Sequence, residues 1–328
     1  MSDEEAQKRL PELRVIYRAR PNDKTRLVRL AQESGFVVGM TGDGVNDAPA
    51  LKAADVGFAM GSGTEVAREA GDIVILDDNI ASIVRAVLYG RTIFRSIRKF
   101  IVFQLTMNLC AVGVSILGPM LGIPAPITVI QMLWVNLIMD TLAGLAFAGE
   151  PPLPDYMRQP PMRRDEPVFT GRMLGEVLTA APLTIAICAW YLGSPLSRRL
   201  FGYGSRQLVF LSGFFVLFIL FAIVNSFNVR TERINLLADI RRNPAFLGIM
   251  ALVAAVQLGM VYLGGELFRT APLTGRELVS LLVLSLAVIP METVRKLLLR
   301  AAEARRNRKQ PIRIDTAEQR TDTVRGAA

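Results

Sequence analysis

The spacing of apolar residues divides the chain into two parts of different character. In the first 90 residues, apolar runs of strand length alternate with polar, helix-like stretches. The apolar runs are Val15–Tyr17, Phe36–Met40, Val56–Met60 and Ile73–Leu76, and the helix-like stretches are Lys24–Glu33 and Thr64–Ala70. This alternation predicts βαβ units around a parallel sheet. Because 90 residues hold only part of such a sheet, we expect residues 1–90 to be a portion of a larger α/β domain.

The second part consists of long apolar segments that follow a basic stretch at residues 91–99. The segments are 100–121, 127–149, 173–193, 207–229, 245–265 and 277–296. The first five are long enough to cross a bilayer as helices, whereas the sixth has only fourteen uncharged residues between Glu277 and Glu292. We therefore predict a transmembrane domain of six helices over residues 91–299, followed by a basic cytoplasmic tail over residues 300–328.

The composition also favours a membrane protein. Apolar residues make up 51% of the chain, and the fifty residues from Phe100 to Gly149 hold one charged side chain, that of Asp140. A segment of this kind cannot form a surface in water, so the lipid bilayer is the first expected partner. We expect a multi-pass integral membrane protein.

The net charge of +9 lies largely beside the apolar segments, so it does not indicate binding to nucleic acid. Lys and Arg cluster in the stretch 91–99, the 150–172 loop, the 230–242 loop and the tail after Arg295. Six spans put all four clusters on one side of the membrane, which predicts that both termini are cytoplasmic. Arg198, Arg199 and Arg206, between the third and fourth spans, reduce this asymmetry. For the basic tail, a membrane-flanking helix is favoured over a regulatory site.

Two residue types limit the possible chemistry. The chain has no His, which excludes Ser-His-Asp triads, general catalysis by His and His-ligated metal sites. Its two cysteines, Cys110 and Cys188, lie inside apolar segments. We therefore expect them to be small buried side chains rather than parts of a zinc site or a disulfide.

The string from Met40 to Gly61 (Met-Thr-Gly-Asp-Gly-Val-Asn-Asp-Ala-Pro, then twelve more residues) has the most specific chemistry. A predicted strand ends there in a turn that carries Asp43, Asn46 and Asp47. In parallel α/β sheets, ligands gather at the carboxyl ends of strands. Two carboxylates and an amide are oxygen ligands that suit Mg²⁺ holding a phosphate. An acidic turn with a purely structural role is the alternative for Gly-Asp-Gly alone.

This string resembles the hinge motif of P-type cation-transporting ATPases, which belong to the haloacid-dehalogenase-like phosphotransferases, and the likeness continues through Asn79. The resemblance implies a partial Rossmann-like phosphorylation domain in which Asp43 binds Mg²⁺ and Asn46 and Asp47 order the phosphate site. It also implies that Lys24 contacts the phosphorylated aspartate and the transferred phosphoryl group. ATP and Mg²⁺ would be the cofactors of the complete enzyme.

The chain departs from this family in the parts that it lacks. The family phosphorylates an aspartate in an Asp-Lys-Thr-Gly-Thr motif, which these 328 residues lack, and Asp23-Lys24-Thr25 is followed by Arg26 instead of Gly. The nucleotide-binding and actuator domains and four further membrane helices have no counterpart here either. Since phosphoryl transfer needs nucleophile, lysine and magnesium site together, we expect no ATP turnover from this chain alone.

Asp140 lies near the centre of the second apolar segment, where an unpaired carboxylate costs several kcal/mol and function is the default explanation. Asn136 precedes it by four residues, and Gln104 and Asn108 have the same spacing on the preceding helix. Oxygen ligands from two helices around one carboxylate suit Ca²⁺. For Gln104 we favour a hydrogen bond between helices instead.

The segment Gln131–Thr141 and the following Glu150-Pro-Pro are similar to calcium pumps, especially those of the plasma-membrane branch. This likeness implies that Asn108, Asn136 and Asp140 are ligands of transported Ca²⁺ and that the protein lies in the plasma membrane. Pumps with two calcium sites have a glutamate where this chain has Ala111 and another in the fourth of these helices. Their absence here fits one Ca²⁺ per cycle. Mn²⁺ or another cation also suits these ligands.

Three hypotheses follow. The chain is an inactive C-terminal part of a calcium-transporting P-type ATPase, or one half of a split pump whose N-terminal half carries the phosphorylated aspartate. In the third, it is a non-catalytic membrane module for ion binding or regulation. The first is favoured over the second.

Overall fold

The chain divides into two units, residues 1–101 with 147–174 and residues 102–146 with 175–328, which we treat separately. A computed structural model describes residues 2–159, 162, 166–231 and 233–309. Most of the predicted basic tail, residues 310–328, lies outside the described residues, as do Arg163 and Arg164 of the 150–172 loop.

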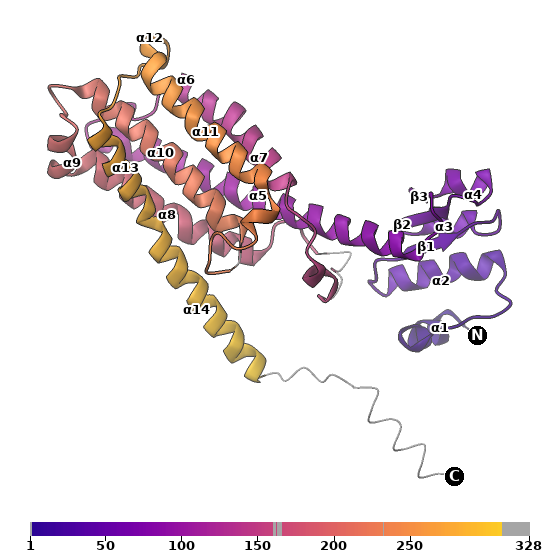
Figure 1. Ribbon diagram of the computed structural model, residues 1–328. Helices are drawn as coiled ribbons and strands as arrows, with labels where there is room; N and C mark the ends of the chain where they lie inside the picture. The colour runs from indigo at the N-terminus through magenta and orange to yellow at the C-terminus, as the bar shows by residue number, and fades with distance from the viewer. Residues whose placement is uncertain (1, 160–161, 163–165, 232, 310–328) are drawn as a thin grey trace. The chain divides into compact units, whose positions relative to one another are not determined.

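The first unit contains a parallel sheet of three strands in the order β1-β2-β3 (Figure 1). The strands are β1 (Gly39–Gly42), β2 (Val56–Met60) and β3 (Ile73–Ile75), and the helices are α1 (Asp3–Arg9), α2 (Pro21–Glu33), α3 (Ala48–Ala53) and α4 (Glu65–Ala70). Helix α3 connects β1 to β2 and α4 connects β2 to β3, so the predicted alternation of strands and helices is confirmed. Pro21 and Asp23 fix the start of α2, and Thr64 caps α4 by accepting from the Ala67 N–H.

One predicted strand is wrong. Residues Val15–Tyr17 form no strand, and the side chains of Val15 and Tyr17 are 81% and 83% exposed. A run of three apolar residues forms a strand only when a neighbouring strand supplies hydrogen bonds, and β1 does not pair with it. The strand predicted at 36–40 begins three residues later, at Gly39, and α1 and α3 were not anticipated.

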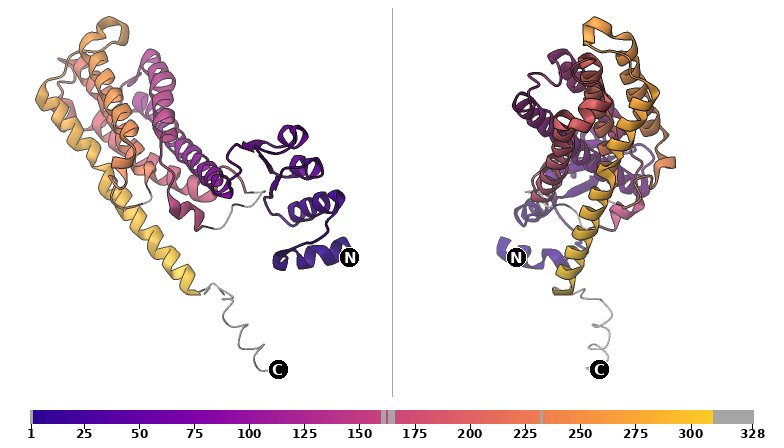
Figure 2. Two further views of the ribbon diagram at one scale, coloured as in Figure 1. Left: turned by 45° about the vertical axis from the view of Figure 1, so that its right-hand side comes forward. Right: turned by 90° about the vertical axis from the view of Figure 1, so that its left-hand side faces the viewer.

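All six predicted membrane segments coincide with helices that are long and apolar enough to cross a membrane, among the residues described (Figures 1 and 2). They are α5 (Ile80–Met120), α6 to α7 (Val129–Ala148), α8 (Gly171–Gly193), α10 (Gln207–Arg230), α11 (Pro244–Leu263), and α13 (Gly275–Leu286) with the start of α14 (Val288–Lys309). Two short helices, α9 (Pro195–Leu200) and α12 (Gly265–Phe268), lie in the connections. Single helical turns cover Leu10–Glu12, Pro154–Met157 and Ile240–Arg242.

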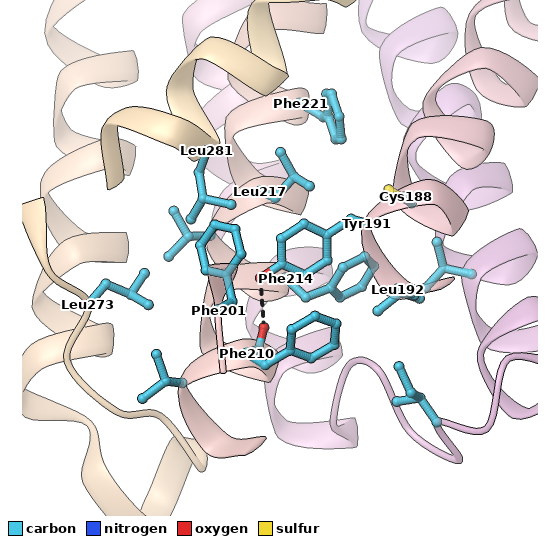
Figure 3. Close-up of a cluster of buried hydrophobic side chains, with 14 of the residues drawn as sticks. Cys188, Tyr191, Leu192, Phe201, Phe210, Phe214, Leu217, Phe221, Leu273 and Leu281 are labelled. Atoms are coloured by element: carbon cyan, nitrogen blue, oxygen red, sulfur yellow. Dashed lines mark hydrogen bonds between the residues drawn. The ribbon is translucent and has the colours of Figure 1, made fainter. Parts of the chain in front are cut away.

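Helix α10 is the most buried of these helices and lies at the centre of the second unit (Figure 2). It is apolar on all sides, as a helix surrounded by others must be. Figure 3 shows Phe210 and Phe214 of α10 packed around Tyr191 of α8. The Tyr191 hydroxyl donates to the Phe210 carbonyl at 3.0 Å, so the one polar atom of this ring is paired.

Two of the three arginines that reduced the charge asymmetry have local partners. Arg198 donates to the carbonyls of Leu192 and Leu121 at 2.9 and 2.8 Å, and its guanidinium lies over the Tyr203 ring. Arg206 pairs with Glu277 at 3.1 Å. These two side chains stabilise the connections between helices, so their positive charge is a weak indicator of orientation.

Candidate functional site

The turn after β1 brings together two of the residues selected from the sequence. Lys24, in the first turn of α2, donates to the carboxylate of Asp47, which is 7% exposed at the start of α3. Because Asp47 is buried, this ion pair gives the lysine a fixed position beside the turn. Sequence spacing alone did not indicate the pairing, since 23 residues separate the two.

Asp43 and Asn46 in the same turn are exposed. The backbone there is tightly packed, because a Cβ on Gly42 would lie 2.8 Å from the Asp47 Cγ, and one on Gly63 would lie 2.8 Å from the Asp43 carbonyl oxygen. The Thr64 N–H donates to that carbonyl oxygen at 2.8 Å. The turn therefore presents a carboxylate and an amide at the carboxyl end of β1, and these oxygen donors fit Mg²⁺.

A chain of hydrogen bonds joins this turn to the start of α5. The Gly61 N–H donates to the Ile75 carbonyl at 2.8 Å, and the Ser62 N–H donates to Asp78 Oδ1 at 3.1 Å. Asp78 has a left-handed backbone with φ of 50°, a conformation that Asp adopts more readily than most residues. Hydrogen bonds from Ser62 hold the pKa of the Asp78 carboxyl below its ordinary value. Asp78 was not among the site residues predicted from the sequence, although Asp-Asp-Asn before a helix is a turn and capping signal.

The basic face of α5 is held by the 150–172 loop within the first unit. Arg91 donates to the Tyr156 carbonyl at 2.8 Å, and Arg98 pairs with Glu166 at 2.9 Å. Lys99 Nζ lies 3.5 Å from Glu150 Oε2. The basic stretch that was interpreted only as a membrane flank therefore also fixes this loop to the helix.

In the second unit, Asp140 is the first residue of α7 and is 5% exposed. Gln104 Nε2, on α5, donates to Asp140 Oδ2 at 2.7 Å. The hydrogen bond between helices that was predicted for Gln104 is thus confirmed, and its acceptor is the candidate ligand itself. The other amide atom, Gln104 Oε1, is buried and has no hydrogen-bond partner among the described residues.

The two asparagines lie differently. Asn108 and Asn136 are exposed, and within the ranges that the structure describes neither shares a hydrogen bond with Asp140. Residues Val135–Met139 form a π-helical turn between α6 and α7, with the Asp140 N–H bonded to the Val135 carbonyl. Such turns insert a residue into a helix and occur often at functional sites. Asp140 and Gln104 are therefore brought together, whereas the asparagines face outward.

Among the described residues, no three His, Cys, Asp or Glu side chains are grouped closely enough to hold a metal ion. Within the described residues, Asp140 would offer a cation one carboxylate beside neutral oxygens from amides or the backbone. That donor set suits a hard cation.

Comparison with known proteins identifies the family. A family model described as "Cation transporting ATPase, C-terminus" matches residues 124–298, just over half of the chain. Plasma membrane calcium-transporting ATPase 3 of Rattus norvegicus is 41% identical over 282 residues, which cover 81% of this chain and 22% of that protein. Calcium-transporting ATPase 9, plasma membrane-type, of Arabidopsis thaliana is 37% identical over 303 residues, covering 91% and 28%.

Calcium-transporting ATPase 2 of Schizosaccharomyces pombe is 37% identical over 298 residues, covering 89% of this chain and 23% of that protein. The chain thus spans about a quarter of the length of these relatives. The family match falls on the last five of the six membrane helices, and the similarity to the relatives extends over at least four fifths of the chain. The chain belongs to the P-type cation-transporting ATPases, as a C-terminal portion that is similar to plasma-membrane-type calcium-transporting ATPases.

Proposed function

We propose that this chain is the C-terminal part of a P-type ATPase. The complete pump would couple ATP hydrolysis to Ca²⁺ transport across the plasma membrane. The observation that carries the proposal is Asp140, a carboxylate that is 5% exposed within an otherwise apolar helical bundle. A carboxylate at this depth is costly unless it binds an ion or pairs with another group. The names of the relatives support Ca²⁺ as that ion.

In this proposal, residues 1–90 belong to a haloacid-dehalogenase-like phosphorylation domain. Asp43 binds Mg²⁺, Asn46 and Asp47 order the phosphate site, and Lys24, paired with Asp47, contacts the transferred phosphoryl group. Bound Mg²⁺ supplies positive charge that neutralises the phosphate oxygens. The nucleophilic aspartate comes from a segment outside these 328 residues, and the chain by itself does not turn over ATP.

The membrane part supplies half of the transport site. Asp140 provides the negative charge, and Asn108 and Asn136 provide neutral oxygens to Ca²⁺. Their outward-facing side chains suit a site that is completed by a further helix of the pump. The lack of a carboxylate at Ala111 and in α10 fits one Ca²⁺ per cycle, and the basic loops put both termini in the cytoplasm.

The test is formation of a phosphoenzyme from γ-³²P-labelled ATP in membranes that contain this chain, with and without the segment carrying the phosphorylated aspartate. We expect Ca²⁺-dependent label only when both are present, and none when Asp43→Ala is introduced here. Asp155→Ala, which removes an exposed aspartate of the same unit, is the matched control and should leave the label intact. Label on this chain alone, or no label with both segments, would contradict the proposal.

A further inference from the structure

The carboxylate of Asp140 has one described hydrogen-bond donor, the side-chain amide of Gln104. The two residues are on different helices, α7 and α5, and 36 positions apart in the chain. An ionised carboxylate accepts hydrogen bonds only, so the amide must present its NH₂ group to Asp140. This requirement fixes the orientation of the amide group. Its carbonyl oxygen Oε1 is then the amide atom that is not bonded to Asp140.

Gln104 Oε1 is buried and has no donor among the described residues. Leaving a buried amide oxygen without a partner costs free energy, and such an atom in a native site calls for an explanation. A cation beside Asp140 provides one, because an amide oxygen is a good ligand for Ca²⁺. The same group would then hold Asp140 at one end and the cation at the other.

We propose that Gln104 is part of the cation site: its NH₂ group orients the Asp140 carboxylate, and its carbonyl oxygen is a further ligand of the transported ion. This inference rests on the proposed function. With Oδ2 engaged by the amide, Asp140 offers its remaining oxygen to the ion, so one carboxylate and neutral oxygens form the donor set. Asn108 follows Gln104 by one helical turn on α5, which extends the row of amides along that helix.

Gln257 on α11 supplies a matched control. It is the same residue type, is 3% exposed, and both its Nε2 and Oε1 atoms are buried without a partner among the described residues. It differs from Gln104 in having no hydrogen bond to a carboxylate. A general effect of removing a buried amide from the bundle would therefore be seen equally at both positions.

The experiment measures equilibrium ⁴⁵Ca²⁺ binding in lipid nanodiscs that contain the full chain together with the N-terminal segment that completes the site. Gln104→Met keeps the length of the side chain and removes both amide atoms, and it should raise the dissociation constant about tenfold, as loss of a supporting group at a metal site does. Gln104→Asn keeps an amide on a shorter side chain and should lose less. Gln257→Met should bind as the parent does, and thermal unfolding without Ca²⁺ should change no more for Gln104→Met than for Gln257→Met.

Asp140→Asn separates this inference from the proposed function. Loss of binding in Asp140→Asn with parental binding in Gln104→Met would overturn the role of Gln104 and leave the proposed function standing. Equal losses in Gln104→Met and Gln257→Met would also overturn it. Binding that does not depend on Asp140, or no binding by the parent chain together with the N-terminal segment, would contradict the proposed site itself.

Discussion

The ion pair between Lys24 and Asp47 shows how one contact can organise the turn after β1. Asp47 is buried, so its charge depends on the lysine, and the pair fixes the turn that presents Asp43 and Asn46. A buried carboxylate that loses its partner is destabilising.

Replacement of Lys24 by Met should therefore loosen the turn, by about 1–2 kcal/mol because the lysine side chain is 36% exposed and partly screened. Hydrogen exchange of peptides covering residues 39–53 in the full chain measures the effect. Lys52→Met, which changes an exposed lysine of α3, is the control and should leave exchange unchanged. Equal exchange in both variants would contradict the role given to the pair.

Sequence spacing identified the residue types of both sites but not their partners. The turn residues Asp43, Asn46 and Asp47 follow a strand, and this local pattern was sufficient to select them. The contacts Lys24–Asp47 and Gln104–Asp140 join separate elements, so they depend on packing that no local pattern contains. The outward position of Asn108 and Asn136 was not evident for the same reason.

At the scale of elements, α5 connects the candidate phosphate turn to the candidate cation site. Asp77 accepts from the Ser82 hydroxyl at 2.7 Å, and Asn79 accepts from the Ala81 N–H at 2.8 Å, so the helix start is capped. Asp78 joins this start to the loop after β2. The same helix carries Gln104 and Asn108 farther along.

We expect Asp78→Ala to disconnect the loop at residues 61–64 from α5, because Ala neither accepts the Ser62 hydrogen bond nor favours a left-handed backbone. Asp78→Asn keeps the acceptor and tolerates the left-handed backbone but removes the charge, so its effect should be smaller than that of Ala. Faster hydrogen exchange in the first turns of α5 for Ala, with a smaller increase for Asn, is the expected result. Parental exchange in both variants would show that the link is not needed.

The pKa of Asp78 adds a pH dependence to this link. Its carboxyl titrates below the ordinary value of 3.8 because Ser62 donates to it. A lowered pKa in the folded state stabilises the fold above the ordinary pKa, and this contribution is lost as the pH falls through the lowered one. The difference in exchange between the parent and Asp78→Ala should therefore be full at pH 6 and diminish below about pH 4.

The six membrane helices were predictable from the sequence because a bilayer requires long uncharged segments, whatever the packing between them. The absence of a strand at Val15–Tyr17 was not predictable in this way, since a strand depends on its neighbours. The continuation of α5 down to Ile80 and the π-helical turn at Val135–Met139 also escaped the apolar pattern. Both lie where backbone hydrogen bonding, rather than hydrophobicity, determines the conformation.

At the scale of the whole molecule, the membrane unit is organised around α10. Phe214 of this helix is fully buried against Tyr191, with ring centroids 5.8 Å apart. Phe214→Ala should leave a cavity and lower the thermal unfolding midpoint of the chain in nanodiscs, by a free energy at or below about 3 kcal/mol because lipid rather than water surrounds the bundle. Leu263→Ala, at a side chain that is 88% exposed, should have little effect. Similar midpoints for both variants would contradict the central position of α10.

The chain covers about a quarter of its relatives, and we propose that its two candidate sites act within a larger pump. The family and the six helices are established by the comparisons and the structure, whereas the identity of the transported ion and the role of Asp140 are proposals. Together, the proposals for the two sites predict that a cation bound at Asp140 is transported when phosphate is transferred beside Asp43.

The most direct test is ATP-driven ⁴⁵Ca²⁺ uptake into sealed vesicles that contain this chain together with the segment carrying the phosphorylated aspartate. The proposed function predicts uptake that is abolished by Asp140→Asn and by Asp43→Ala and retained in Gln257→Met. Uptake that persists in Asp140→Asn, or none in the parent under conditions where another divalent cation is transported, would contradict it.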